Sequence, residues 1–353
     1  MSEWQTFCLK DLGRIVGGAT PSTNNPKNYG NKIAWITPKD LSTLQGRYIK
    51  KGSRSISRLG FKSCSCVLLP KHAILFSSRA PIGYVAIAKK RLCTNQGFKS
   101  IIPNKKIYFE FLYYLLKYHK DNISNIGGGT TFKEVSGATL GLFKVKIPPT
   151  YYEQQKIART LSILDQKIEN NHKVNELLHK ILELLYEQYF VRFDFLDENN
   201  KPYQTSGGKM KFSKELNRLI PSGWSVRFLN HKIVSTYQPK TISKTLLNDS
   251  YSYSVYGGGG IIGRFTEYNH EQSEFIISCR GQCGISYLTL PKSWITGNAM
   301  VIRPTKSYTS KTYLYHTIKK YKLTNYITGS VQPQITRQNL STMPILIYPK
   351  EKP

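Results

Sequence analysis

The chain has 353 residues, enough for two domains and a connection, and its 51 Lys and Arg against 21 Asp and Glu give a formal net charge of +30. Such a charge predicts a polyanionic partner, most often nucleic acid, with an anionic membrane surface as the alternative. No apolar run approaches the roughly 18 residues of a membrane span, and six cysteines without a signal-peptide pattern predict reduced thiols in a cytoplasmic protein.

Residues 1–149 predict a basic α+β module, because they carry 24 basic and 6 acidic side chains and alternate short apolar runs with turn residues. The expected strands are 32–37, 65–69, 73–78, 83–88 and 99–103. An aromatic stretch at 108–122 predicts a helix, whose Tyr and Leu side chains at helical spacing are more typical of a core than of a binding surface.

Residues 150–190 contain no Gly or Pro and predict one long spacer helix of roughly 60 Å, at 1.5 Å per residue. Its apolar stripe is interrupted by Asn171, as polar residues interrupt coiled-coil seams. The stripe comprises Ile157, Leu161, Leu164, Ile168, Leu178, Leu182 and Leu185. Such a stripe needs a second helix to bury it, so these residues predict a subunit interface. Two helices broken near Asn170 and Asn171 are the alternative.

Residues 191–218 are polar and rich in turn residues, which is typical of a linker. The second module, 219–353, is again basic, with 14 basic and 4 acidic side chains in residues 219–349. A second aromatic helix is expected late in this module, at 311–326. Two basic modules on a nearly neutral spacer suit two separate contacts with one long polyanion.

The second module repeats elements of the first in the same order. "SSRAPIG" (77–83) recurs as "SCRGQCG" (278–284), which puts Arg79 and Arg280 in the same place. Two further pairs are "TNQGFKSIIP" (94–103) with "ITGNAMVIRP" (295–304), and 125–149 with 325–349. Chance similarity would not keep several separate elements in order, so the repeat predicts two domains of one design.

This order of module, long helix and module resembles the DNA-specificity subunit of type I restriction–modification systems over nearly the entire chain. The motifs that carry the resemblance are "GGATPSTNNPKNYGNKIAWITPKDL" (17–41), "SSRAPIG" (77–83), "TNQG" (94–97), "IPPTYYEQQKIARTLSILDQKI" (147–168), "YEQYFVRFDF" (186–195), "LIPSGW" (219–224) and "GSVQPQI" (329–335). The resemblance implies two similar target-recognition domains joined by a coiled-coil-forming helix, each reading half of a split sequence in double-stranded DNA.

The resemblance also implies partners in host defence. Methyltransferase subunits would dock on the spacer helix and methylate adenine, and a restriction subunit would add cleavage. S-adenosylmethionine, ATP and Mg are expected on those subunits, so we expect no cofactor, metal or catalytic residue in this chain. The family has a second long helix after the second domain, whereas this sequence stops at "ILIYPKEKP". We therefore expect another polypeptide, either a second copy or a methyltransferase subunit, to cover the stripe.

Candidate DNA contacts are basic, amide and hydroxyl side chains on the repeated loops, the groups that bind phosphates and base edges. They are Thr20, Ser22, Thr37, Lys39, Ser77, Ser78, Arg79, Asn95, Gln96, Lys133, Arg264, Arg280, Gln332, Gln334 and Arg337. Arg79 could instead brace its own domain, and amides next to glycine are often turn formers. In the second module "ITGN" replaces "TNQG" and "SVYGGGGIIGRF" (254–265) takes the place of "TPKD", so the two modules should read different half-sites.

Other functions have weaker support in the sequence. Gly258, Gly260 and Gly263 match G-x-G-x-x-G, but no alternation of strands and helices surrounds them, which favours a turn or DNA-facing loop. A zinc site would need Cys64 and Cys66 with two cysteines of the other module, at spacings unlike those of common fingers. A stand-alone nuclease or methyltransferase remains the alternative function, and a bivalent RNA-binding protein, suggested by 24 tyrosines, is a third.

Overall fold

The computed structural model describes residues 3–128, 133–306, 309–329 and 332–349. The chain divides into two compact units, Met1–Glu176 and Leu177–Pro353, each of which contains one of the repeats. In the described part of the chain, no helix combines the length and the apolarity that a membrane span requires. Parts of the repeated segments, at 129–132 and 330–331, lie outside the described residues.

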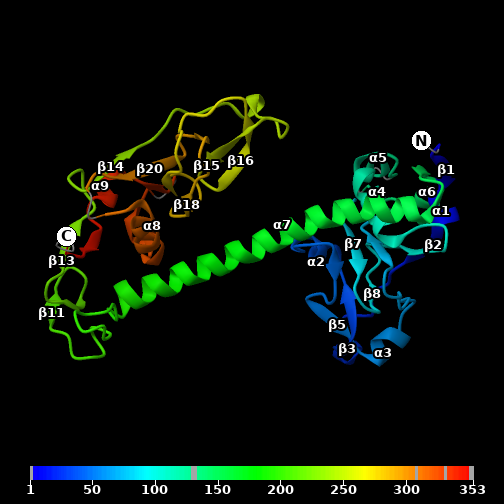
Figure 1. Cartoon of the computed structure of the whole chain (residues 1–353), viewed down its shortest axis with the longest axis horizontal. Helices are drawn as coiled ribbons and strands as arrows, with labels where there is room; N and C mark the ends of the chain where they lie inside the picture. The colour runs from blue at the N-terminus through cyan, green and yellow to red at the C-terminus, as the bar shows by residue number, and fades with distance from the viewer. Residues whose placement is uncertain (1–2, 129–132, 307–308, 330–331, 350–353) are drawn as a thin grey trace. The chain divides into compact units, whose positions relative to one another are not determined.

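The first unit is an α+β lobe (Figure 1). Its strands are β1 (Gln5–Cys8), β2 (Gly13–Gly17), β3 (Tyr29–Ile36), β4 (Tyr48–Ile49), β5 (Arg54–Ile56), β6 (Ile74–Phe76), β7 (Val85–Ala88), β8 (Cys93–Thr94), β9 (Lys99–Pro103) and β10 (Lys144–Ile147). Its shorter helices are α1 (Leu9–Leu12), η1 (Pro26–Asn28), α2 (Pro38–Ser42), α3 (Arg58–Lys62), α4 (Phe109–Tyr118), α5 (Lys120–Asn125) and α6 (Gly137–Leu142). The strand expected at 65–69 does not form; only Leu69 pairs there, with Leu92.

The second unit has a similar set of elements after the long helix. Its strands are β11 (Met210–Ser213), β12 (Arg218–Pro221), β13 (Ser225–Phe228), β14 (Val234–Tyr237), β15 (Tyr253–Gly257), β16 (Gly260–Phe265), β17 (Phe275–Ser278), β18 (Ser286–Leu288), β19 (Trp294–Ile295), β20 (Ala299–Pro304), β21 (Ile327–Thr328), β22 (Gln334–Ile335) and β23 (Pro344–Ile347). Its helices are η3 (Lys244–Leu246), α8 (Lys311–Lys320), η4 (Leu323–Tyr326) and α9 (Arg337–Leu340).

The two units share one topology, which confirms the repeat. The sheet order β2–β9–β6–β7 in the first unit corresponds to β14–β20–β17–β18 in the second, and β5–β3–β8 corresponds to β16–β15–β19. The terminal pairs β1–β10 and β13–β23 match as well. Helices α6 and α9, each of which precedes the last strand of its unit, have equivalent caps. The hydroxyls of Ser136 and Thr336 accept amide hydrogen bonds at the start of these helices.

The aromatic helices pack as core elements in both units. In the first, Phe111, Leu112 and Leu116 of α4 are buried against the central strands, and α5 continues the expected helical stretch. In the second, Tyr313, Leu314 and other apolar residues of α8 are buried in the same way. The core interpretation is therefore confirmed for these buried residues, whereas Tyr118 at the end of α4 is 82 % exposed.

The spacer helix α7 (Tyr151–Tyr186) runs through Asn170 and Asn171 without interruption, and a π-helical turn, η2 (Glu187–Val191), follows it. Its first half packs on the first lobe through small and polar residues, because Gln154, Ala158 and Ser162 are the buried positions. The single helix predicted from the sequence is thus observed, and the pair of helices broken at the asparagines is not.

The segment 191–218, expected to be a linker, is folded. Strand β11 within it pairs with β12, and Phe193 is 2 % exposed in an apolar cluster with Ile220, Trp224 and Leu346. Although the segment is mostly polar and rich in turn residues, its few aromatic residues are sufficient to anchor it to the second lobe. This part of the chain therefore belongs to the second unit rather than forming an open connection.

Candidate nucleic-acid interface

The arginine-bearing turn is closed by the same hydrogen bonds in both units. The hydroxyl oxygens of Ser77 and Ser278 each accept a hydrogen bond from the amide seven residues further on, at 2.8 and 2.9 Å. Each hydroxyl also donates to the carbonyl four residues further on. The residue after each arginine is left-handed, with φ of 49° and 75°. The serine therefore closes the turn, and Arg79 and Arg280 occupy equivalent positions on it.

The loops that carry the other first-lobe candidates lie close to the first turn. The 94–97 loop accepts amide hydrogen bonds from Ser78, at 2.8 Å, and from Ala19, at 3.0 Å. Its own amide donates to the last residue of β3, immediately before the 37–40 loop, at 2.9 Å. Thr20 donates a hydrogen bond to the side chain of Gln96 across these loops. The fold thus gathers into one surface region residues that are far apart in the sequence.

Several first-lobe candidates have a structural task. Ser77 and Ser78 are buried, and the hydroxyl of Ser78 donates to the 94–97 loop at 3.2 Å. Thr37 caps α2 and donates through its hydroxyl to Asp40 at 2.7 Å. Burial opposes the ionisation of Asp40, but hydrogen bonds from the Ser53 and Thr37 amides outweigh it and lower the pKa of this carboxyl. The hydroxyls of these two serines and this threonine are therefore already used within the lobe, and their contact with DNA stays a prediction.

The remaining first-lobe candidates are more accessible. Asn95 is half-buried and its side-chain oxygen accepts the Gly97 amide at 3.0 Å, which is a turn-forming role. The exposed candidates are Thr20, Ser22, Lys39, Gln96 and Lys133. Arg79 borders a surface hollow, whose other lining residues are Ala80, Pro81, Ile82, Ser124, Lys133 and Glu134.

A carboxylate neutralises part of the charge at this hollow. One Glu134 oxygen lies 3.3 Å from a guanidinium nitrogen of Arg79 and the other lies 3.3 Å from the Lys99 ammonium. The side chains of Arg79 and Glu134 remain 37 % and 35 % exposed, so the pair is accessible to solvent. Arg79 thus braces its own lobe and still reaches the surface, and the two interpretations of this residue are compatible.

The second lobe builds the same region from different residues. The amide of Thr296 donates to the carbonyl of Tyr256 at 2.9 Å, which puts the 254–265 hairpin where the first lobe has the 37–40 loop. A Cβ added to Gly258 would lie 3.3 Å from the Arg280 carbonyl oxygen, so the hairpin tip reaches the arginine turn. The glycine-rich match is therefore the turn of a two-stranded antiparallel hairpin and not the start of a helix.

The second-lobe candidates differ in accessibility. Arg280, Gln332, Gln334 and Arg337 are exposed. Arg264 instead donates to the carbonyls of Tyr251 and Ser252, both at 2.5 Å, and holds the base of the hairpin. Because these bonds occupy part of its guanidinium, Arg264 has fewer N–H groups left to bind DNA than the sequence suggests.

Three residues in these regions were not singled out from the sequence. Glu134 and Lys99 form the ion pairs described above, and Gln238 donates to the Cys279 sulfur at 2.9 Å and to the Gly297 carbonyl at 3.3 Å. Glu134 could have been found, because the repeat aligns it with Gln334. Gln238 could not have been found in this way. The registers of β2 with β9 and of β14 with β20 align Gln238 with Gly17, and the sequence separation of this pair is larger than that of the other repeated elements.

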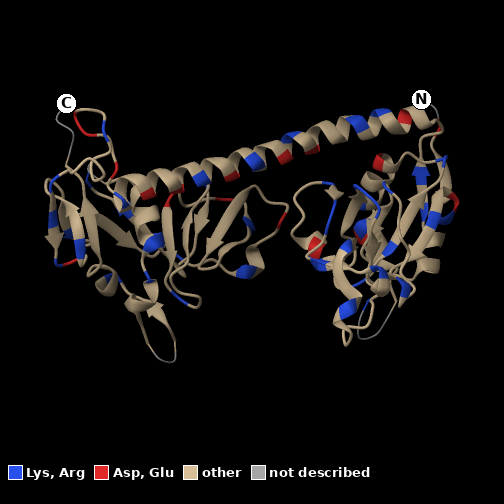
Figure 2. Cartoon of the chain, turned by 90° about the horizontal axis from the view of Figure 1, so that it is seen from below, with Lys and Arg blue, Asp and Glu red and all other residues tan. Residues whose placement is uncertain are grey.

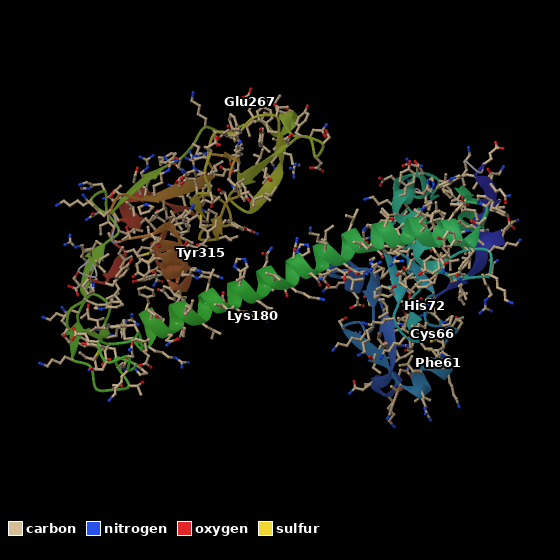
Figure 3. All side chains as sticks on the ribbon, viewed as in Figure 1. Phe61, Cys66, His72, Lys180, Glu267 and Tyr315 are labelled. Carbon is tan, nitrogen blue, oxygen red and sulfur yellow. The ribbon has the colours of Figure 1, made fainter. Side chains whose placement is uncertain are left out.

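The cysteines do not resemble metal ligands. Cys66 lies in the first lobe (Figure 3), where a hydrogen bond with Cys93 and burial raise the pKa of its thiol. Burial also raises the pKa of Cys279 in the second lobe, and neutral thiols are poor ligands. Within the described residues, no group of three or more His, Cys, Asp and Glu side chains is arranged to hold a metal ion.

The apolar stripe of α7 is exposed along most of its length. Ile157 is the exception, because it is partly buried against the core of the first lobe, and its assignment to a subunit interface stays a prediction. The other stripe residues are exposed by 37 % to 56 %: Leu161, Leu164, Ile168, Leu178, Leu182 and Leu185. The lobe contact uses the neighbouring face of Gln154, Ala158 and Ser162, which leaves the stripe uncovered.

Comparisons with known proteins agree with these features. The family model "Type I restriction modification DNA specificity domain" matches residues 1–180 and 221–352. The chain is 44 % identical over 230 residues to the type I restriction enzyme MjaIX specificity subunit of Methanocaldococcus jannaschii, covering 64 % of this chain and 51 % of the relative. It is 31 % identical over 191 residues to the HindI specificity subunit of Haemophilus influenzae, covering 52 % and 40 %.

The chain therefore spans about half the length of the first of these relatives and less of the second. In structure it is similar to a type I restriction–modification S subunit from M. genitalium, with a TM-score of 0.59 at 17 % identity, over 98 % of this chain and 84 % of that one. This likeness shows the fold, and the family match covers most of both lobes. The resemblance predicted from the motifs is confirmed: the chain belongs to the type I restriction–modification DNA specificity domain family.

Proposed function

We propose that this chain is a sequence-specific DNA-binding specificity subunit of a type I restriction–modification complex, and that each lobe reads one half of a bipartite target. The observation that supports this most is the pair of accessible arginines, Arg79 and Arg280, held by one turn design in two basic lobes. Guanidinium groups bind both phosphates and the major-groove edge of guanine. Lys and Arg are spread over both units (Figure 2), as phosphate binding requires.

The stripe of α7 supports a docking role. The six exposed stripe residues, each 37 % or more exposed, are costly in water, and association with another protein would bury them. We infer that methyltransferase subunits bind there, with a second copy of the chain as the competing occupant, and that a restriction subunit joins this complex in the cytoplasm. S-adenosylmethionine, ATP and Mg²⁺ would be bound by those subunits, and this chain would contribute recognition without catalysis.

The test is to map methylated adenines in a host that carries this chain together with matched methyltransferase subunits. We expect every methylated site to contain two short defined half-sites separated by a gap of undefined bases. The control host carries the methyltransferase subunits alone and should show no such sites. A single continuous target, or the same sites in the control, would contradict the proposal.

A companion assay addresses catalysis directly. The purified chain is incubated with duplex DNA, Mg²⁺ and S-adenosylmethionine in the absence of other subunits. We expect neither methyl transfer nor strand cleavage, and either activity would instead support a stand-alone modifying enzyme. Competition between duplex DNA and single-stranded RNA in the same buffer should favour the duplex.

A further inference from the structure

The two recognition turns differ in one charged position. In the first lobe the residue that lies beside the turn is Glu134, which makes ion pairs with Arg79 and Lys99. The amide following it donates to the carbonyl of Ser78 at 3.0 Å, which fixes this strand segment against the turn. The backbone at Glu134 is therefore fixed beside the first arginine turn, and its carboxylate lies within reach of Arg79.

The second lobe has the same backbone contact without the carboxylate. The amide of Ile335 donates to the carbonyl of Cys279 at 3.0 Å, and the backbones of Arg280 and Gln334 pair as an isolated bridge. Gln334 is the counterpart of Glu134 and is neutral, and the buried Met300 takes the place of Lys99. The residue whose backbone lies beside Arg280 is thus neutral, whereas Arg79 makes an ion pair with the carboxylate at the equivalent position.

We propose that Glu134 is a specificity-determining residue that restrains the first lobe from binding phosphate, and that Gln334 leaves the second lobe without this restraint. The inference rests on the proposed DNA-binding function. A phosphate that approaches Arg79 also meets the negative charge of Glu134, whereas a neutral base edge does not carry a charge to be repelled. The carboxylate therefore weakens non-specific contacts more than specific ones.

The geometry allows the restraint to be released. An ion pair with both partners about one-third exposed holds the two side chains only weakly, because water screens it. The guanidinium of Arg79 can therefore exchange Glu134 for an acceptor on the target. In the second lobe no such exchange is needed at Gln334, so Arg280 is available to the DNA from the start.

The test exchanges the two residues in the full-length chain. Binding to a mixed-sequence 40-base-pair duplex is measured by fluorescence anisotropy over a series of salt concentrations. Glu134→Gln should bind about three- to tenfold more tightly at low salt, with a salt slope steeper by about 1. The reason is that Arg79, no longer paired with a carboxylate, can contact one more phosphate. Gln334→Glu should show the opposite changes, in affinity and in slope.

Matched controls carry the same change in charge away from the turns. Glu198→Gln, at an exposed position of the other unit, controls for Glu134→Gln, and Gln5→Glu, exposed on β1, controls for Gln334→Glu. Both controls should shift affinity by less than about twofold, because exposed charges far from the interface are screened. Melting temperatures close to that of the wild type confirm that the variants are folded.

A second arm identifies the cation responsible. Arg79→Ala should abolish the gain of Glu134→Gln when the two are combined, but should weaken the wild-type chain only slightly. If the wild-type chain shows no salt-dependent DNA binding, the proposed function fails. If it binds but the exchanged variants behave like their controls, or if the gain survives Arg79→Ala, the role of Glu134 is refuted and the proposed function stands.

Discussion

Arg47 fixes the middle of the spacer helix to the first lobe. Its side chain is 5 % exposed, and its nitrogens lie 3.5 Å from Glu110, 3.7 Å from Asp165 and 3.7 Å from Glu169. The last two carboxylates belong to α7, whereas Glu110 belongs to α4. One guanidinium therefore joins a core helix to the spacer helix, and Tyr114 adds a hydrogen bond to Asp165 at 2.8 Å. Three carboxylates at this site would repel one another without it.

Replacement of this arginine should destabilise the first unit. Arg47→Met keeps much of the side-chain volume but leaves three carboxylates without their cation. We expect the free energy of unfolding to fall by about 2–3 kcal/mol, because breaking a buried ion pair is costly even when its partners are partly exposed. Arg47→Lys should lose less, since it keeps the charge. Urea denaturation measures both, and a loss below that of the exposed control Arg54→Ala would contradict the assignment.

The spacer helix has two adjacent faces with different tasks. The face toward the first lobe has small and polar residues, because Ala158 and Ser162 allow close approach and Gln154 accepts an amide hydrogen bond from Tyr108 at 2.8 Å. Near its end, Glu183 pairs with Lys319 at 3.0 Å and the Tyr186 hydroxyl donates to Thr317 at 3.1 Å. Both ends are thus held by polar contacts together with a few apolar ones, and most of the apolar stripe is left exposed.

Charge on the stripe should prevent assembly without unfolding the chain. Leu164→Glu combined with Leu178→Glu replaces side chains that are 56 % and 51 % exposed, so the melting temperature should change little. Co-purification with methyltransferase subunits, or the larger species in size-exclusion chromatography, should be lost, because an interface core does not accept unpaired charges. The control variant, Gln166→Glu with Asn175→Glu, adds equal charge at polar, exposed positions of α7 and should assemble normally. Unchanged assembly of the leucine variant would exclude the stripe as the docking surface.

At the scale of the whole molecule, two copies of one lobe are connected through a single helix (Figure 1). Residues 170–176 of this helix are all exposed, and the boundary between the two compact units follows them. A change in this stretch therefore alters neither the core of a lobe nor the contacts of a recognition turn. It should alter only the relation between the two half-sites.

Deletion of residues 170–176 should shorten the gap in the DNA target. Seven residues are about two helical turns and roughly 10 Å, which corresponds to about 3 base pairs at 3.4 Å each. Methylation mapping should show unchanged half-sites at a smaller separation. Substitution of the same seven residues by a helix-forming sequence of equal length should keep the original gap, and a change within either half-site would refute the spacer role.

The order of lobe, helix and lobe follows from the sequence alone, because it depends on local periodicity and on the repetition of whole motifs. The turn around Arg79 and Arg280 was recognisable for the same reason, and the structure closes both copies with the same hydrogen bonds. The failed strand at 65–69 shows the limit: Cys66 and Leu69 are buried there, but a strand also needs a neighbouring chain to complete its ladder.

Only the tertiary structure decided which polar groups remain available. The hydroxyls of Ser77 and Ser78 are already hydrogen-bonded inside their lobe. Arg79 pairs with Glu134, 55 residues away along the chain, whereas the backbone of Arg280 pairs with that of neutral Gln334. The same holds for α7, whose lobe-facing side is polar and small and could not be distinguished from a solvent-facing side by periodicity. The physical reason is common to all three: hydrogen-bonding and ion-pair partners come from distant loops, and the sequence pattern records a residue's type but not its neighbours in space.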